Sequence, residues 1–197
     1  MHRSLSFLAS FVLLLLGLHA ALAVEAVRVP PDAQAIDLTQ AVEHYSSQTD
    51  AIQVSTAPGA DRIVRRIEVT AKETGAHPAW IVLALANDTS EQMERLLVAP
   101  HFRLVGSGVI WPDLGSARIK AITPSQGVAL ESEESADADI FRLTLDPGAT
   151  VTYVAELSAA TLPQIYLWEP DAYKDKLASL TLYKGNVIGI SGLLALY

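Results

Sequence analysis

The sequence predicts an all-β protein: a single antiparallel β-sandwich, jelly-roll-like, with an N-terminal signal peptide and the start of a C-terminal membrane helix. Two observations predict the sandwich: short segments in which apolar and polar residues alternate with a period of two, and turn residues between these segments. No segment has the pattern of a long capped amphipathic helix, which argues against a parallel sheet with crossover helices.

The first 23 residues follow the order of a secretory signal peptide. Arg3 supplies the positive charge, residues 5–18 are almost wholly apolar, and Ala21 and Ala23 are small residues that a signal peptidase accepts. The apolar run is short for a membrane span, which needs about 20 residues, although an uncleaved anchor is the alternative. We therefore predict export, with cleavage after Ala23.

Residues 24–180 are predicted to form the exported domain. Leu38, Val42 and Tyr45 share one face of a possible helix over 37–45. Eight or nine strands follow, at 52–56, 63–69, 80–86, 93–98, 109–111, 118–122, 140–145, 151–157 and 165–168. The turn sequence Asp146-Pro147-Gly148 predicts that the segments on either side of it pair with each other. The acidic stretch 131–139 is interpreted as a solvated loop, because a calcium loop would contain a glycine in its bend.

Residues 181–197 are interpreted as the start of a truncated transmembrane helix. After Asn186 every residue is apolar, small or Ser191. The segment from Val187 onward would rise only about 16 Å as a helix, roughly half a bilayer. An apolar strand or core helix that closes the domain is the alternative interpretation.

The composition limits the classes of function. The chain has a net charge of −8, and removal of Arg3 with the signal peptide makes it more acidic, so nucleic acid is not an expected partner. The absence of cysteine excludes a thiolate nucleophile and a cysteine-bound metal. The histidines are not spaced as metal ligands, and no G-x-S-x-G motif occurs. We expect no cofactor, no metal and no catalytic activity, and a periplasmic hydrolase is the weakest alternative.

Aromatic residues at strand ends are the candidates for ligand binding. Trp111 and Trp168 both stand at the end of a predicted strand, where strands meet loops, and Tyr166 lies beside Trp168. Sugar-binding sandwiches use exposed tryptophans as platforms, whereas tryptophans buried in a sandwich core are the commoner case. We therefore predict Trp111, Trp168 and Tyr166 as ligand-binding residues.

The C-terminal third carries a family resemblance. Residues 145–154 (LDPGATVTYV) and 162–173 (LPQIYLWEPDAY) are followed by Tyr183-Lys184-Gly185 and the apolar segment. This order resembles the end of the extracytoplasmic jelly-roll sensor domain of seven-transmembrane receptors with diverse intracellular signalling modules. Most of the mature chain is also similar to the N-terminal periplasmic region of bacterial membrane proteins with GGDEF and EAL modules, which make and break cyclic di-GMP. The chain has neither module, so their enzymatic activity is not expected here.

The resemblance implies a periplasmic sensory domain tethered to the inner membrane by its C-terminal segment. Its expected partner is a small-molecule ligand, with carbohydrate as one possibility, or a periplasmic protein. The strand at 165–168 would pass a ligand-induced shift to the membrane helix. The alternative is a free-standing secreted or periplasmic β-sandwich with a binding or structural role.

Overall fold

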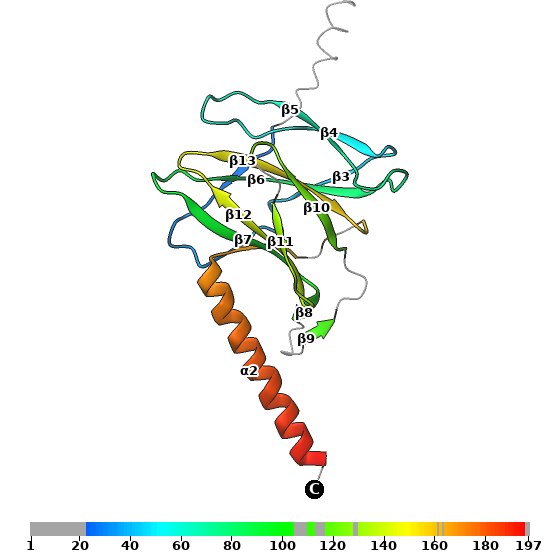
Figure 1. The fold of residues 1–197 in the computed structure, drawn as a ribbon, viewed down its shortest axis with the longest axis vertical. Helices are drawn as coiled ribbons and strands as arrows, with labels where there is room; N and C mark the ends of the chain where they lie inside the picture. The colour runs from blue at the N-terminus through cyan, green and yellow to red at the C-terminus, as the bar shows by residue number, and fades with distance from the viewer. Residues whose placement is uncertain are drawn as a thin grey trace, which may run out of the picture.

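A computed structural model describes residues 23–104, 110–112, 117–127, 130–160, 162 and 164–195. Strands dominate the domain, and one long helix leaves it at the C-terminal end (Figure 1). The predicted signal peptide lies outside the described residues except for Ala23. Val24, the first residue after the predicted cleavage site, is already buried in the domain.

The first five-stranded sheet is centred on two long strands, β6 and β13. Its members are β1 (Ala26–Arg28), β3 (Glu43–Ser46), β6 (Ala79–Ala86), β13 (Thr150–Leu157) and β10 (Ile119–Pro124). β13 lies between β6 and β10, while β1 and β3 pair with the other edge of β6. The β1–β6 pair is parallel, which corrects the prediction of a purely antiparallel sandwich. Residues 29–78 supply the long connection that a parallel pair requires.

The second five-stranded sheet has the order β11-β12-β7-β14-β2, and all its pairs are antiparallel. Its members are β11 (Glu131–Glu133), β12 (Ala138–Leu145), β7 (Met93–Pro100), β14 (Tyr166–Trp168) and β2 (Ala35–Asp37). The predicted Asp146-Pro147-Gly148 turn is present, with Gly148 at φ 65°. However, β12 and β13 belong to different sheets, so the expected pairing across this turn is wrong: the turn passes the chain between the two layers.

Two small hairpins complete the strands. β4 (Ala51–Ser55) pairs with β5 (Arg66–Thr70), and this hairpin lies over the outer face of the first sheet (Figure 1). β8 (Phe102–Leu104) pairs with β9 (Ile110–Pro112) at the end of the domain from which the helix leaves. The β4–β5 hairpin therefore adds a third layer to the two sheets of the sandwich.

The uninterrupted apolar run of β6 is explained by burial on both of its faces. Ile81, Leu83 and Leu85 point into the main core between the sheets. The residues that alternate with them, such as Trp80 and Val82, pack beneath the β4–β5 hairpin in a second cluster. Because successive strand residues face opposite sides, a strand covered on both sides loses its polar alternation.

The helix α2 (Pro170–Ala195) begins earlier than the sequence predicted. We expected a membrane helix from residue 181, but strand β14 ends at Trp168 and the helix starts at Pro170. Proline suits the first helical position because it has no N–H to leave unpaired. The Glu169 carboxylate accepts a hydrogen bond from the Ala172 N–H at 2.7 Å and caps the helix.

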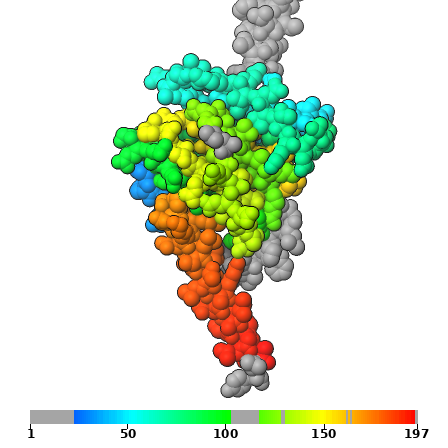
Figure 2. Space-filling view, viewed as in Figure 1, coloured from blue at the N-terminus to red at the C-terminus, as the bar shows by residue number. Residues whose placement is uncertain are grey.

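Most of α2 extends beyond the domain, as the space-filling view shows (Figure 2). It is long and apolar enough to cross a membrane by length and composition. Leu182, Ile188 and Leu194 are 68%, 71% and 72% exposed, so this apolar surface has no protein cover among the described residues.

The short helix predicted over 37–45 is wrong. Asp37 ends β2, and its carboxylate accepts a hydrogen bond from the Thr39 N–H at 2.8 Å, which closes a turn. Leu38 is fully buried in the main core, and β3 begins at Glu43. Aspartate often bonds the backbone two residues ahead, and here this turn overrides the helical spacing of the apolar residues.

Candidate functional site

The candidate site is the cleft between α2 and the outer face of the second sheet, which we call the helix–sheet cleft. It has a volume of about 300 Å³, the lower end of the range for small-molecule sites. Strands β7, β8 and β14 form one wall, and the first half of α2 forms the other. Its aromatic lining consists of Phe102, Tyr166, Trp168 and Tyr173.

Strand β14 places two of the three predicted ligand residues in the cleft. Leu167 points inward and is buried in the main core. Tyr166 and Trp168 flank it, so both side chains lie on the outer face of the sheet, as strand alternation requires. This pair of predicted residues is therefore brought together.

The junction between β14 and α2 is held by an aromatic contact. The rings of Trp168 and Tyr173 have centroids 5.8 Å apart and planes tilted by 53°, a favourable geometry for two aromatic rings. Tyr173 is 8% exposed and packs on Leu96 and Val98 of β7, while Trp168 is half-buried. The sequence analysis did not name Tyr173 as a site residue. A signal was available, because Tyr173 follows Trp168 closely in the sequence and the Glu169-Pro170 pair between them is typical of a helix start.

The Tyr166 phenol stays neutral well above physiological pH. Burial raises its pKa, and the negative charge of Asp37 adds to this effect. A neutral phenol in an apolar cleft both donates and accepts hydrogen bonds, so Tyr166 is suited to orient a polar group of a ligand.

Charged groups from α2 stand at the open side of the cleft. Lys184 Nζ lies 3.3 Å from Asp137 Oδ2, and this exposed pair spans from the helix to the acidic loop. Lys176 also lines the cleft, and no ion pair of Lys176 is found in the described part of the chain. By contrast, Lys174 is turned away and pairs with Asp171 at 2.8 Å.

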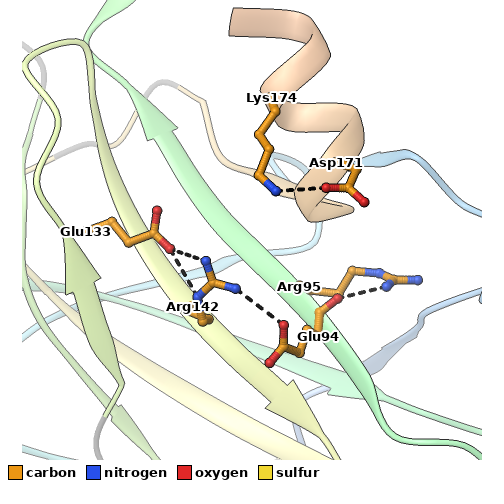
Figure 3. A network of polar contacts seen from close by, with 6 residues as sticks. All are labelled: Glu94, Arg95, Glu133, Arg142, Asp171 and Lys174. Atoms are coloured by element: carbon orange, nitrogen blue, oxygen red, sulfur yellow. Dashed lines mark hydrogen bonds and ion pairs between the residues drawn. The ribbon is translucent and has the colours of Figure 1, made fainter.

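The sheet surface beside the helix start has its own polar network (Figure 3). The Arg142 guanidinium lies between Glu133 Oε1, at 2.6 Å, and Glu94 Oε2, at 3.3 Å. These carboxylates, Glu133 foremost, raise the pKa of Arg142 above its usual range. Arg95, the next residue along from Glu94, instead bonds the Pro30 and Pro31 carbonyl oxygens at 3.2 and 3.1 Å. Glu133 lies in β11, so Arg142 of β12 ties two neighbouring strands together. The solvated loop predicted over 131–139 is therefore confined to 134–137, because 131–133 and 138–139 are strand.

The structure does not test Trp111, the third predicted ligand residue. Its backbone lies in β9, opposite Arg103 of β8. Its side chain lies outside what the structure describes, so its predicted role remains a prediction. Phe102 of the same hairpin does line the cleft, and sequence reasoning missed it.

Larger hollows lie elsewhere on the surface, at about 660 Å³ beside the acidic loop and about 570 Å³ at the open edge between β10 and β12. Neither contains a predicted ligand residue, and both are shallower and less aromatic than the helix–sheet cleft. We therefore place the candidate site at the helix–sheet cleft. This choice rests on its aromatic lining, and not on its volume, which is smaller than that of the other two hollows.

His101 forms a pair with Asp139, which the sequence did not reveal. The His101 Nε2 atom lies 2.9 Å from Asp139 Oδ1, and Nδ1 lies 3.2 Å from the Ala136 carbonyl oxygen. The other Asp139 oxygen accepts the Ile119 N–H at 2.8 Å, while burial raises the Asp139 pKa. Both ring nitrogens face acceptors within the fold, so we interpret His101 as a structural tie between β7, β10 and β12.

No group of three or more His, Cys, Asp or Glu side chains capable of holding a metal ion is found in the described ranges. Comparison with known proteins gave no match to any family model, curated protein or solved structure. The site must therefore be interpreted from its own geometry.

Proposed function

We propose that this chain is the extracytoplasmic sensory domain of a membrane signalling protein, tethered by α2, with the helix–sheet cleft as its ligand site. The observation that carries the proposal is the direct continuation of β14 into α2. Only Glu169 separates Trp168 from Pro170, so the tether joins the domain without a flexible linker. The resemblance to receptors with cyclic di-GMP modules supports a signalling role without catalysis in this chain.

The cleft offers a simple route for coupling. A ligand between β14 and α2 would contact both walls and favour one angle of the helix over another. A ligand shifts such an equilibrium only by its difference in affinity for the two arrangements. The Trp168–Tyr173 contact lies at the vertex of this angle, so it holds the start of the helix while the rest of α2 changes its angle.

The second candidate is a free-standing exported binding or structural protein. Tyr173 favours it, because this residue makes the first turn of α2 part of the domain. The exposed apolar side chains beyond Leu177 favour the tether instead, since large exposed apolar patches on soluble proteins mark interaction or membrane surfaces.

Cysteine labelling separates these two candidates, because the chain contains no native cysteine. The full chain would carry Gln48→Cys on the distal side of the domain or Ser191→Cys in the helix. In membrane vesicles with the domain outside, a membrane-impermeant maleimide should label Gln48→Cys at once and Ser191→Cys only after detergent is added. Recovery of the protein in the soluble fraction, with both sites labelled equally, would reject the tether.

The sensory role is tested by ligand-induced stabilisation. The full chain in detergent would be screened by thermal shift against a panel of mono- and disaccharides and common metabolites. A sensory cleft predicts a concentration-dependent rise in melting temperature that is lost in Trp168→Ala. A rise that persists unchanged in Trp168→Ala would place the ligand elsewhere.

A further inference from the structure

We propose that the helix–sheet cleft binds a phospholipid of the membrane that α2 enters, with an acyl chain against the aromatic wall and the anionic phosphate at Lys176. This inference rests on the proposed function, because it requires α2 to be a tether. It replaces the unspecified small ligand with one chemical class.

The shape of the cleft gives the first argument. Tyr173, at the start of α2, is 8% exposed, whereas Leu177 is 37% exposed and Leu182 68%. The helix therefore diverges from the sheet along its length, and the cleft widens toward the apolar half of α2. An acyl chain can enter from the bilayer along the helix without crossing water.

The lining gives the second argument. Phe102, Trp168 and Leu177 offer apolar surface, and Leu180 adds to it on the helix side. Trp and Tyr are enriched where membrane proteins meet the bilayer surface, because their rings are apolar and their N–H or O–H groups are polar. A sugar would leave many hydroxyl groups without partners on this wall, which is costly.

The charges give the third argument. The chain as a whole has a net charge of −8, yet the cleft lining contains two lysines and one carboxylate. Asp137 is engaged by Lys184 at 3.3 Å, so Lys176 is the lysine of the lining that has no ion pair among the described residues. Basic residues beside a membrane helix attract anionic lipid headgroups.

The test uses the full chain in nanodiscs of phosphatidylcholine with a fraction of phosphatidylglycerol that carries a diazirine on one acyl chain. After illumination, mass spectrometry should find adducts on Tyr166, Trp168 or Leu177, above those on residues 185–195. Lys176→Gln should lower the cleft adducts about fivefold, while the matched control Lys174→Gln, whose lysine pairs with Asp171, should not. Leu180→Trp should fill the cleft and remove these adducts without a change in charge.

The outcomes separate this inference from the function on which it rests. Adducts confined to residues 185–195 would overturn the lipid site and leave the tether intact. No adduct anywhere, with the protein outside the nanodisc, would overturn the tether itself. Displacement of the cleft adducts by maltose or glucose, or by a fatty acid added from the aqueous phase, would assign the cleft to a soluble ligand and overturn the lipid assignment.

Discussion

The two sheets of the sandwich are covered on their outer faces in different ways. The β4–β5 hairpin closes the first sheet over a cluster that includes Ile52, Val54, Val69 and Trp80, all nearly inaccessible to solvent. Among the residues that the structure describes, the second sheet is covered on its outer face by the first turns of α2, whose one buried side chain is Tyr173. The hairpin is therefore a closed part of the fold, whereas the helix joins the second sheet through a single residue, Glu169, and leaves a cleft.

The polar contacts of the two covers differ in the same way. Beneath the hairpin, Thr152 and Glu156 are buried, and their side chains accept hydrogen bonds from the backbone N–H groups of Ala57 and Lys72. Beside α2, the ion pairs are exposed and therefore contribute little to stability. We infer that the hairpin side contributes more to the stability of the domain than the helix side does.

The largest expected effect is the loss of stability from truncation beneath the hairpin. Trp80 is 1% exposed, so Trp80→Ala should remove about 3–5 kcal/mol from the free energy of unfolding through lost burial and a cavity. Urea unfolding of the full chain in detergent, followed by far-UV circular dichroism, measures this loss. Trp80→Phe, which keeps most of the ring, should lose less, and a loss below 1 kcal/mol for Trp80→Ala would show that the hairpin is not a closed cover.

A smaller loss is expected from a single buried hydrogen bond on the same side. In the parent protein the Thr152 hydroxyl accepts a hydrogen bond from the Ala57 N–H at 2.9 Å. Thr152→Val keeps the shape of the side chain but removes this acceptor, so the free energy of unfolding should fall by about 1–3 kcal/mol. Thr152→Ser keeps the hydroxyl and is the matched control, so its unfolding free energy should lie closer to the parent. A larger loss for Thr152→Ser than for Thr152→Val would mean that packing of the methyl group, rather than the hydrogen bond, holds the hairpin.

The helix side should tolerate a comparable truncation better. Trp168 is half-buried, so Trp168→Ala should cost only about 1–2 kcal/mol, within the common range for point mutations. The same unfolding measurement compares it directly with Trp80→Ala. A loss of 3–5 kcal/mol would make Trp168 a structural anchor and remove the contrast between the two covers.

The strands with a clear apolar pattern could be predicted from the sequence. The strands that form only because they pair with a longer neighbouring strand were missed. All nine predicted strands correspond to strands of the structure, and the short β1, β2, β3, β8 and β11 were missed. Strands of three or four residues have too few positions to show a period, and the backbone of a longer neighbour fixes them. β1, for example, is a strand because its residues pair with the end of β6.

The cleft could be predicted only on its strand side. The position of Trp168 and Tyr166 at a strand end identified two of the four aromatic residues in the lining. The helix side of the cleft depends on α2 starting at Pro170, and that start was hidden because Lys174, Asp175 and Lys176 interrupt the apolar pattern by which membrane helices are recognised.

The smallest expected effect is a change in the titration of Tyr45, whose phenol lies on the hairpin side of the domain. Burial, with a hydrogen bond from the Tyr45 hydroxyl to Glu43 at 2.6 Å and the charge of Glu43, raises the pKa of Tyr45 to about 12. The unfolded-state value is about 10. The neutral phenol is therefore favoured by the fold, and its contribution to stability is fully present below pH 10 and declines as the pH rises through 12.

Absorbance at 295 nm, compared between the parent and Tyr45→Phe across pH 9–13, isolates the ionisation of this phenol. The difference curve should have its midpoint near pH 12, and the stability of the parent should fall more steeply than that of Tyr45→Phe between pH 10 and 12. The same comparison with Tyr166→Phe reports on the open side, where the pKa is also raised. A Tyr45 midpoint near 10 would mean that solvent reaches the phenol beneath the hairpin, so that the first sheet is no better covered than the second.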